Sequence, residues 1–533
     1  MSAELAVLTV EGCVAWASGP LLLAPRDLAR VAACTGSLSG VVAQACLQRM
    51  RTAQSHWLVP LRGVVGLARA ERTLHRLQRQ RSACLHPTCV AAENYSTGLD
   101  RQGRLLIWGR PGWMELRTGV EDDFQPQVDW PTLPPRIVRV PTGTKAGAMP
   151  DASSPCISSV AASRHAVFAI TADGSLMYAQ VQRRGDMTIQ TVELHPLQEL
   201  RGVKLETIST RYGQAFAVTP DGAVYAWGMK TGDPDRPENS CSMGFGSVAT
   251  LLHPTPLPCF GRGPSATPIR SVAAGVSHTL FVSVYGEVYG VGRLDSGKLG
   301  LGQVGKCHGG SRQVLSPTKI HFDKRPSPQI VAAAAGARHS LFLANTGEVW
   351  GCGAAKSGAL ATSNGGDSAG SLCFPVLLDK LLCFCTAIAA GISSSFYVAD
   401  RGEVYFTGTA RQTPWPFNRP SKADPRDPHL IPGLSRIEQV TVSMELSFFQ
   451  WEHAIFVAED GGLFGWGHLG HGEFQVAALS GTAAKDSSSW KSSGRSIGES
   501  CSRARVEEQA LQATPGFCNC VVPISYCPDT TLT

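Results

Sequence analysis

The chain has 533 residues, of which 43% are hydrophobic and 17% are charged, and its formal net charge is +6. This composition supplies enough apolar surface for a core, and the length exceeds that of one ordinary domain. The small excess of 48 basic over 42 acidic residues does not by itself indicate a nucleic-acid binder. No apolar run is long enough to span a membrane. No basic residue precedes the first apolar stretch, so the N-terminus does not have the pattern of a secretory signal. We expect a cytoplasmic or nuclear protein.

Residues 1–20 have the pattern of a β-hairpin. The alternating segment Leu5–Thr9 leads to the dipeptide Glu11-Gly12, and a second apolar segment ends at Trp16. An x-Gly dipeptide between two alternating segments is typical of a tight hairpin turn. Two interpretations stay open: the hairpin closes the last unit of a repeat fold, or it is a further repeat. We favour closure, because joining the two ends of the chain hides the exposed end of a sheet.

Residues 61–83 form the one strongly basic stretch. The segment from Gly66 to Arg79 contains good helix formers and no proline, and Leu67, Leu74 and Leu77 lie on one helical face. A basic amphipathic helix could bind nucleic acid, an acidic protein or an anionic membrane. The alternative, which we favour, is a helix on the side of the fold with its charges in water. The candidate binding residues in this stretch are Arg69, Arg72, Arg76 and Arg79.

From about residue 88 onward, one sequence motif recurs about every 60 residues. Its clearest copies are Val272–Gly292 and Ala333–Gly353. In each copy two alternating apolar segments flank an x-Gly dipeptide, which predicts two antiparallel strands joined by a turn that needs positive φ. The turn glycines are Gly103, Gly174, Gly222, Gly286, Gly347, Gly402 and Gly461.

Three further positions recur around each turn. Small residues ending in Gly275, Gly336 and Gly391 indicate strands whose backbones approach closely. A polar position holds His278, His339 and His453 in three repeats, and we interpret it as a hydrogen-bonding site between strands rather than a metal site. An aromatic position holds tryptophan in three repeats, where a large ring would fill the wedge between adjacent units. These tryptophans are Trp108, Trp227 and Trp466.

The segments between the repeats differ in length and composition. Residues 110–156 form the longest connection and contain the acidic cluster Glu121, Asp122 and Asp123, which we take as a candidate binding site because long loops often carry function. The repeat pattern stops near residue 475. Residues 476–533 are predicted to be a low-complexity, disordered tail, because a segment rich in Ser, Gly and Ala buries little apolar surface.

The sequence contains no recognisable catalytic or metal motif. It lacks the Gly-x-Ser-x-Gly motif of hydrolases, a phosphate-binding loop ending in Gly-Lys-Ser/Thr, and the His-Glu-x-x-His motif of zinc proteases. The 17 cysteines have no regular spacing, and the pairs Cys383-Phe-Cys385 and Cys518-Asn-Cys520 lack a partner pair at zinc spacing. We expect free, buried thiols in a reducing compartment, and no cofactor or metal.

The repeated motif resembles that of the regulator of chromosome condensation family, whose pattern is close to V-A-A-G-x-x-H-T-L-x-L-x-x-x-G-x-V-Y-x-W-G. The resemblance spans residues 88–470. It implies a seven-bladed β-propeller, which we assign to residues 1–475. The shorter period and Trp-Asp ending of WD repeats do not fit.

The fold leaves three functions open, and fold alone does not choose among them. The first is a non-enzymatic scaffold that binds protein partners through its loops. The second, implied by the family resemblance, is guanine-nucleotide exchange on a small GTPase, in which the acidic cluster could compete for the metal or for a phosphate-binding lysine. The third is association with chromatin or nucleic acid through the arginines of residues 61–83. We rank them in this order.

Overall fold

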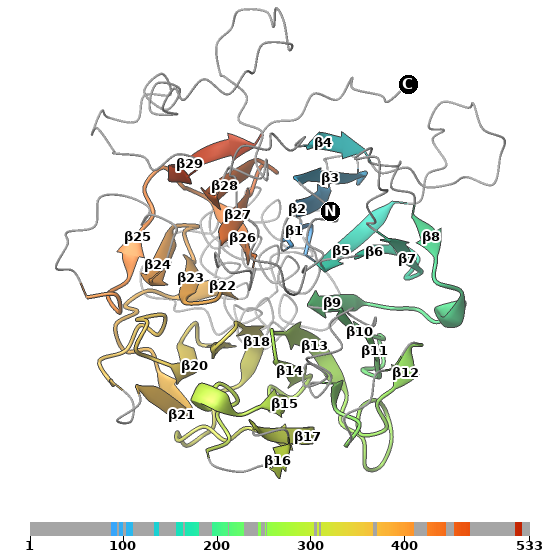
Figure 1. Ribbon diagram of the computed structural model, residues 1–533, viewed down its shortest axis with the longest axis horizontal. Coiled ribbons are helices and arrows are strands. Elements are labelled where there is room, and N and C mark those ends of the chain that lie inside the picture. The colour runs from blue at the N-terminus through green and yellow to red at the C-terminus, as the bar shows by residue number, and fades with distance from the viewer. Residues whose placement is uncertain are drawn as a thin grey trace, which may run out of the picture.

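The computed structural model describes most of the repeat region. The described residues are 87–92, 95–99, 103–109, 133–137, 156–163, 166–180, 194–211, 213–228, 243–246, 251, 253–302, 306–308, 311–365, 370–409, 424–443, 452–468 and 517–524. They form seven antiparallel sheets arranged as blades in a ring (Figure 1), which confirms the predicted seven-bladed propeller. Short helical turns among these residues include η3, Gln198–Leu200, and η5, Asp295–Gly297. None of the described helices is long and apolar enough to cross a membrane.

The strands follow one another around the ring. Blades 1 and 2 comprise β1 Cys89–Ala91, β2 Tyr95–Leu99, β3 Leu105–Gly109, β4 Leu133–Ile137, β5 Ile157–Ser163, β6 Ala166–Thr171, β7 Leu176–Gln180 and β8 His195–Pro196. Blades 3 and 4 comprise β9 Thr207–Arg211, β10 Gln214–Val218, β11 Val224–Gly228, β12 Thr255–Pro256, β13 Ile269–Ala274, β14 His278–Ser283, β15 Val288–Arg293, β16 Lys306–His308 and β17 Ser311–Lys319. Blades 5 to 7 comprise β18 Ile330–Ala335, β19 His339–Ala344, β20 Val349–Ala354, β21 Ser371–Leu377, β22 Cys385–Ala390, β23 Ser394–Ala399, β24 Val404–Gly408, β25 His429–Leu430, β26 Ile437–Val442, β27 His453–Ala458, β28 Leu463–His468 and β29 Phe517–Ile524.

Each blade places its first strand innermost and the other strands successively further out, except that in blade 4 the short β16 lies outside β17. In blade 4, β14 pairs with β15 so that His278 lies opposite Gly292 and Val282 lies opposite Val288. Gly286 makes the turn between them with φ of 78°, as the x-Gly pattern predicts. The inner strands contact one another around the ring, and β1 contacts both β5 and β26. This last pair of contacts closes the ring.

The outermost strands explain the recurring prolines. The outermost strand of a blade is an edge, where a residue without a backbone N–H does not interrupt the sheet. Among the described edge strands, β4, β8, β12, β21 and β29 each contain proline. In blade 4, Pro317 of β17 lies beyond the residues 311–313 that pair with β16.

Strand β29 corrects the predicted extent of the tail. Phe517–Ile524 falls within residues 476–533, yet it pairs with β28, with Leu463 opposite Ile524 and Gly467 opposite Cys518. Its sequence ends in Val-Val-Pro-Ile, which combines strand-forming β-branched residues with an edge proline. The remaining residues of that span lie outside the described part of the chain. Blade 7 thus reaches four strands without residues 1–20, which also lie outside the described residues.

The tryptophans of the aromatic position pack between blades, as predicted. The ring of Trp227 in blade 3 meets Phe168 of blade 2 edge-on, with ring centroids 5.9 Å apart. Trp466 in blade 7 lies 5.6 Å from Phe396 of blade 6. Trp108 in blade 1 belongs to a buried cluster with Ile455 of blade 7. Each ring therefore packs against the preceding blade.

The turn glycines allow a matched test of how closely neighbouring blades pack. Gly402 and Gly433 have nearly equal φ, 79° and 80°, but a Cβ at Gly402 would overlap the backbone of Arg436, whereas a Cβ at Gly433 would meet nothing. We expect Gly402→Ala to lower the free energy of unfolding by about 3 kcal/mol and Gly433→Ala by about 1 kcal/mol. Urea unfolding of both variants measures the difference. Equal losses would show that left-handed strain alone, and not the contact with blade 7, requires Gly402.

Candidate functional site

The polar position forms hydrogen bonds between blades, as the sequence predicts. The Nε2 atom of His278 in blade 4 lies 2.8 Å from Oγ of Ser340 in blade 5. His339 repeats this contact with Ser395 of blade 6 at 2.9 Å. His453 of blade 7 contacts Ser96 of blade 1 at 3.0 Å. In blade 1, the hydroxyl of Tyr95 donates to the carbonyl of Ser163 in blade 2 at 2.6 Å.

These histidines have structural roles. His278 and His339 are almost completely buried. Burial lowers the pKa of His339 to about 4, because the charged imidazole would lose its solvation. Both rings are therefore neutral near pH 7 and suited to one hydrogen bond with the next blade. Their spacing around the ring gives no metal site, and no group of three or more metal-ligating residues occurs in the described part of the chain.

The glycine position explains how closely adjacent backbones approach. A Cβ on Gly275 of blade 4 would lie 2.9 Å from the carbonyl oxygen of Gly336 in blade 5. A Cβ on Gly336 would in turn meet the carbonyl oxygen of Gly391 in blade 6. The N–H of Ala337 donates to that same Gly391 oxygen at 3.1 Å. The small residues thus permit contact between the turns of successive blades.

A buried carboxyl group joins blades 6 and 7. Glu452 immediately precedes His453, and its carboxyl group accepts hydrogen bonds from the Ile392 N–H and, at 2.8 Å, from the Ser394 hydroxyl. Glu452 is 2% exposed, and burial raises its pKa to about 7. Sequence reasoning missed this residue, although an acid directly before the polar position is a visible departure from the other repeats.

A buried lysine fixes the glycine-rich loop of blade 4. The Nζ atom of Lys298 donates to Oγ of Ser277 at 2.7 Å and to the carboxylate of Asp295 at 2.8 Å. Burial lowers the pKa of Lys298, and the Asp295 carboxylate opposes that shift. The Lys298 carbonyl also accepts the hydroxyl of Ser340 at 2.6 Å, which ties the loop to blade 5.

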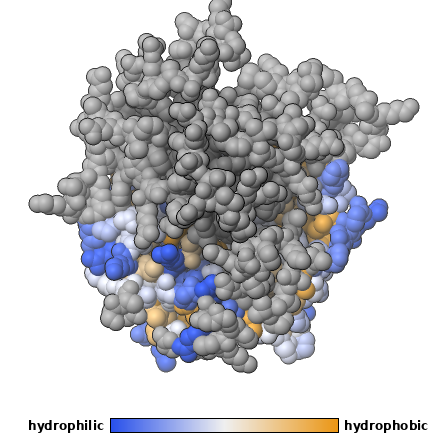
Figure 2. Space-filling view, viewed as in Figure 1, coloured by the Kyte–Doolittle hydropathy of each residue, from blue (hydrophilic) through white to orange (hydrophobic). Residues whose placement is uncertain are grey.

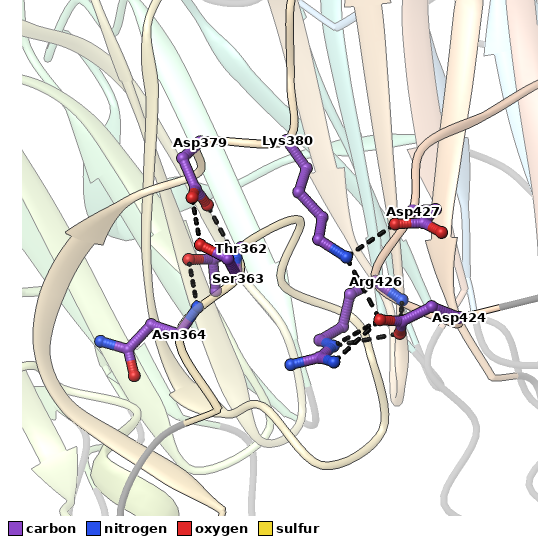
Figure 3. Close-up of polar contacts among 8 residues, drawn as sticks. All are labelled: Thr362, Ser363, Asn364, Asp379, Lys380, Asp424, Arg426 and Asp427. Carbon is purple, nitrogen blue, oxygen red and sulfur yellow. Dashed lines mark hydrogen bonds and ion pairs between the residues drawn. The ribbon is translucent and has the colours of Figure 1, made fainter.

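A polar cluster joins the surfaces of blades 5 and 6 (Figure 3). We call it the blade 5–blade 6 cluster, and it comprises Thr362, Ser363, Asn364, Asp379, Lys380, Asp424, Arg426 and Asp427. Lys380 in the segment after β21 donates to Asp427 at 2.6 Å and to Asp424 at 3.2 Å, both just before β25. Arg426 binds Asp424 through Nε at 3.0 Å and through a second guanidinium nitrogen at 2.8 Å.

Both signs of charge persist in this cluster at neutral pH. The Arg426 hydrogen bond lowers the pKa of Asp424, and the Asp427 hydrogen bond raises the pKa of Lys380. On the blade 5 side, Asp379 accepts the backbone N–H of Ser363 at 2.8 Å. Single exposed ion pairs contribute little stability, so the chief property of the cluster is a fixed pattern of charge between two blades.

Exposed apolar side chains lie on the same two blades. Leu382, two residues after Lys380, is 95% exposed. Phe374 and Leu377 on β21 and Leu430 on β25 are also exposed. On the face shown in Figure 2, the described surface mixes hydrophilic residues with small hydrophobic areas. Blades 5 and 6 therefore combine ordered charges with apolar side chains that a partner could cover.

A cavity of about 220 Å³ lies on the propeller axis. Inner strands of all seven blades line it, largely with alanine and valine. Two of its polar side chains serve ring closure. Gln439 of blade 7 donates to the Cys89 carbonyl at 2.7 Å and accepts the Thr88 N–H at 3.2 Å. Thr441 accepts the Ala91 N–H at 3.2 Å.

The predicted binding residues lie outside the described part of the chain. They are Glu121, Asp122 and Asp123 in the connection between β3 and β4, and Arg69, Arg72, Arg76 and Arg79 before β1. The structure therefore brings none of them into a described site, and their roles stay predictions.

Comparison with known proteins identifies the type of repeat in this chain. Family models described as the regulator of chromosome condensation (RCC1) repeat match residues 285–343 and 330–358, across blades 4 and 5. With the seven-bladed ring and the recurring turn glycines, these matches identify the repeat unit. The chain contains repeats of the regulator of chromosome condensation family.

Curated relatives share the repeat region at low identity. The ultraviolet-B receptor UVR8 of Arabidopsis thaliana is 26% identical over 57% of this chain and 61% of the receptor. The guanine nucleotide exchange factor SRM1 of Saccharomyces cerevisiae is 30% identical over 31% of this chain and 33% of its own length. The chain thus spans less than two thirds of each relative. The structure of human WBSCR16 matches with a TM-score of 0.46 and 20% identity, covering 71% of this chain and 89% of that one.

The raised pKa of Glu452 predicts a pH-dependent stability. An acid with a folded pKa of about 7, against an ordinary 4.5, stabilises the fold fully below pH 4.5 and loses that contribution as pH rises through 7. Glu452→Gln cannot ionise, so we expect the stability of the variant relative to the native chain to rise by about 3 kcal/mol between pH 4.5 and pH 8. Urea unfolding at both pH values, with the partly exposed Glu206→Gln as control, tests this. A pH-independent difference would contradict it.

Proposed function

We propose that this chain is a non-catalytic scaffold that binds protein partners through the connections at one face of the propeller. In an antiparallel blade, the connection from the third to the fourth strand leaves the same end as the connection from the first to the second. The long connections 110–132, 229–254 and 469–516 all join third to fourth strands, whereas the turns between second and third strands, such as 284–287, are short. We call the first end the variable face.

This concentration of long connections is the observation that carries the proposal. A rigid ring with its longest connections at one face is suited to presenting different binding residues on a constant framework. The buried polar side chains described above already serve the contacts between blades. The two relatives, named as a light receptor and an exchange factor, share the repeats while differing in activity, which supports a framework whose function depends on the connections.

The scaffold proposal is tested by reversing charge on the variable face. Partners are recovered with the full chain, identified by mass spectrometry, and titrated against Glu121→Lys/Asp122→Lys/Asp123→Lys. We expect affinity to fall about tenfold or more, because a charged loop at a contact is replaced by one of opposite sign.

The control reverses three acids at the opposite face, Glu206→Lys/Asp323→Lys/Glu403→Lys, and should leave affinity unchanged. Glu206 and Asp323 lie in connections that lead into the first strand of a blade, and Glu403 lies in the turn between β23 and β24. Equal loss in both triple variants, or none in either, would contradict binding through the variable face at this connection.

Guanine-nucleotide exchange on a small GTPase is the second candidate. The 30% identity to SRM1 over 174 residues favours it. An exchange factor acts by binding the nucleotide-free GTPase more tightly than the loaded form, so it needs a binding surface rather than a catalytic group. The variable face supplies such a surface, and the cluster Glu121–Asp123 is the predicted contact for the GTPase's metal or lysine.

Release of a fluorescent GDP analogue from Ran-like and Rab-like GTPases tests exchange. We expect acceleration by the full chain at micromolar concentration, and a smaller rate with Glu121→Ala/Asp122→Ala/Asp123→Ala, since binding energy drives release. Unchanged release across the panel would exclude exchange on those GTPases while leaving the scaffold proposal intact.

A further inference from the structure

Two cysteines face each other where blade 5 passes into blade 6. Cys383 is the second-last residue of the segment 378–384, and Cys385 begins β22. Their Sγ atoms lie 3.7 Å apart. Cys385 is completely buried, whereas Cys383 is partly exposed and follows the 95% exposed Leu382. Cys383 is thus the more accessible cysteine of the pair, and Cys385 is the buried one.

The flanking residues hold the two sulfurs in place. The N–H of Cys385 donates to the Gly347 carbonyl at 3.1 Å, and the carbonyl of Phe384 accepts the Asp400 N–H at 2.9 Å. Upstream, Lys380 is bound to Asp427 in the blade 5–blade 6 cluster. The pair therefore lies between two anchored points of the backbone.

We propose that Cys383 and Cys385 form a reversible dithiol site that exchanges with small-molecule disulfides such as oxidised glutathione. In the first step the Cys383 thiolate attacks one sulfur of the disulfide, a Cys383–glutathione bond forms, and one glutathione thiolate leaves. In the second step Cys385 gives its proton to solvent and attacks Cys383 Sγ, which releases the second glutathione thiolate. Two cysteine thiols are oxidised to one disulfide, and one glutathione disulfide is reduced to two thiols.

The environment assigns a role to each sulfur. The hydrogen bond between the two sulfurs lowers the pKa of Cys383 and favours its reactive thiolate. The same contact, together with burial, raises the pKa of Cys385. Cys383 is therefore the attacking thiol and Cys385 the resolving one. Closing the bond requires the sulfurs to approach from 3.7 Å to about 2.05 Å.

Peptide mapping of the full chain tests the site. Cleavage after Lys380 and Arg401 releases a peptide whose cysteines are Cys383 and Cys385. After reduction, exposure to oxidised glutathione and blocking with N-ethylmaleimide, we expect this peptide to lose two hydrogen atoms and to carry neither glutathione nor maleimide. Added dithiothreitol should restore labelling of both thiols.

Two variants separate the roles. Cys385→Ser should leave a stable glutathione adduct on Cys383, because the resolving thiol is absent. Cys383→Ser should leave Cys385 unmodified, because Cys385 is buried.

The exposed thiols Cys156 and Cys259 serve as internal controls for reagent access. They should gain glutathione under the conditions in which the pair closes. A stable glutathione adduct on Cys383 of the native sequence, or two unreacted thiols while Cys156 is modified, would overturn the proposal.

Discussion

The contact between neighbouring blades is the interaction on which the whole structure depends. A single four-stranded sheet has two faces to bury. Here one face packs against the preceding blade and the other against the following blade. The repeat supplies both halves of this contact. Its polar position, as in His278 and His339, reaches forward to the following blade, and its aromatic position, as in Trp227 and Trp466, packs backward on the preceding one.

The fold was predictable because its requirements are local. A turn that needs positive φ favours glycine, as at Gly286. The space between adjacent blades favours a large aromatic side chain, as at Trp466. These marks recur at a fixed interval, so seven blades could be counted from the sequence. Strand β29 was not predicted because residues 469–516 separate it from its partner β28. The outer strand of blade 7 therefore lacks the spacing found in the other repeats.

The polar groups of the candidate surfaces were less predictable. Lys380 meets Asp424 across 44 positions, and Glu452 meets Ser394 across 58, so only the closed ring brings them together. The role of the polar position could be inferred, since three histidines on separate blades cannot share one ion. The residues singled out for binding, Glu121 and Arg69 among them, come from segments that the repeat does not specify. Function therefore depends on the part of the sequence with the least internal regularity.

The closure between blades 1 and 7 has a consequence for the order of the chain. Each blade is built from consecutive strands, and β26 meets β1 through Gln439 and Thr441 rather than by exchanging a strand. The contact between β26 and β1 is then equivalent to the contact between any other two successive inner strands. A circular permutant that begins at a different blade would therefore encode the same ring of contacts.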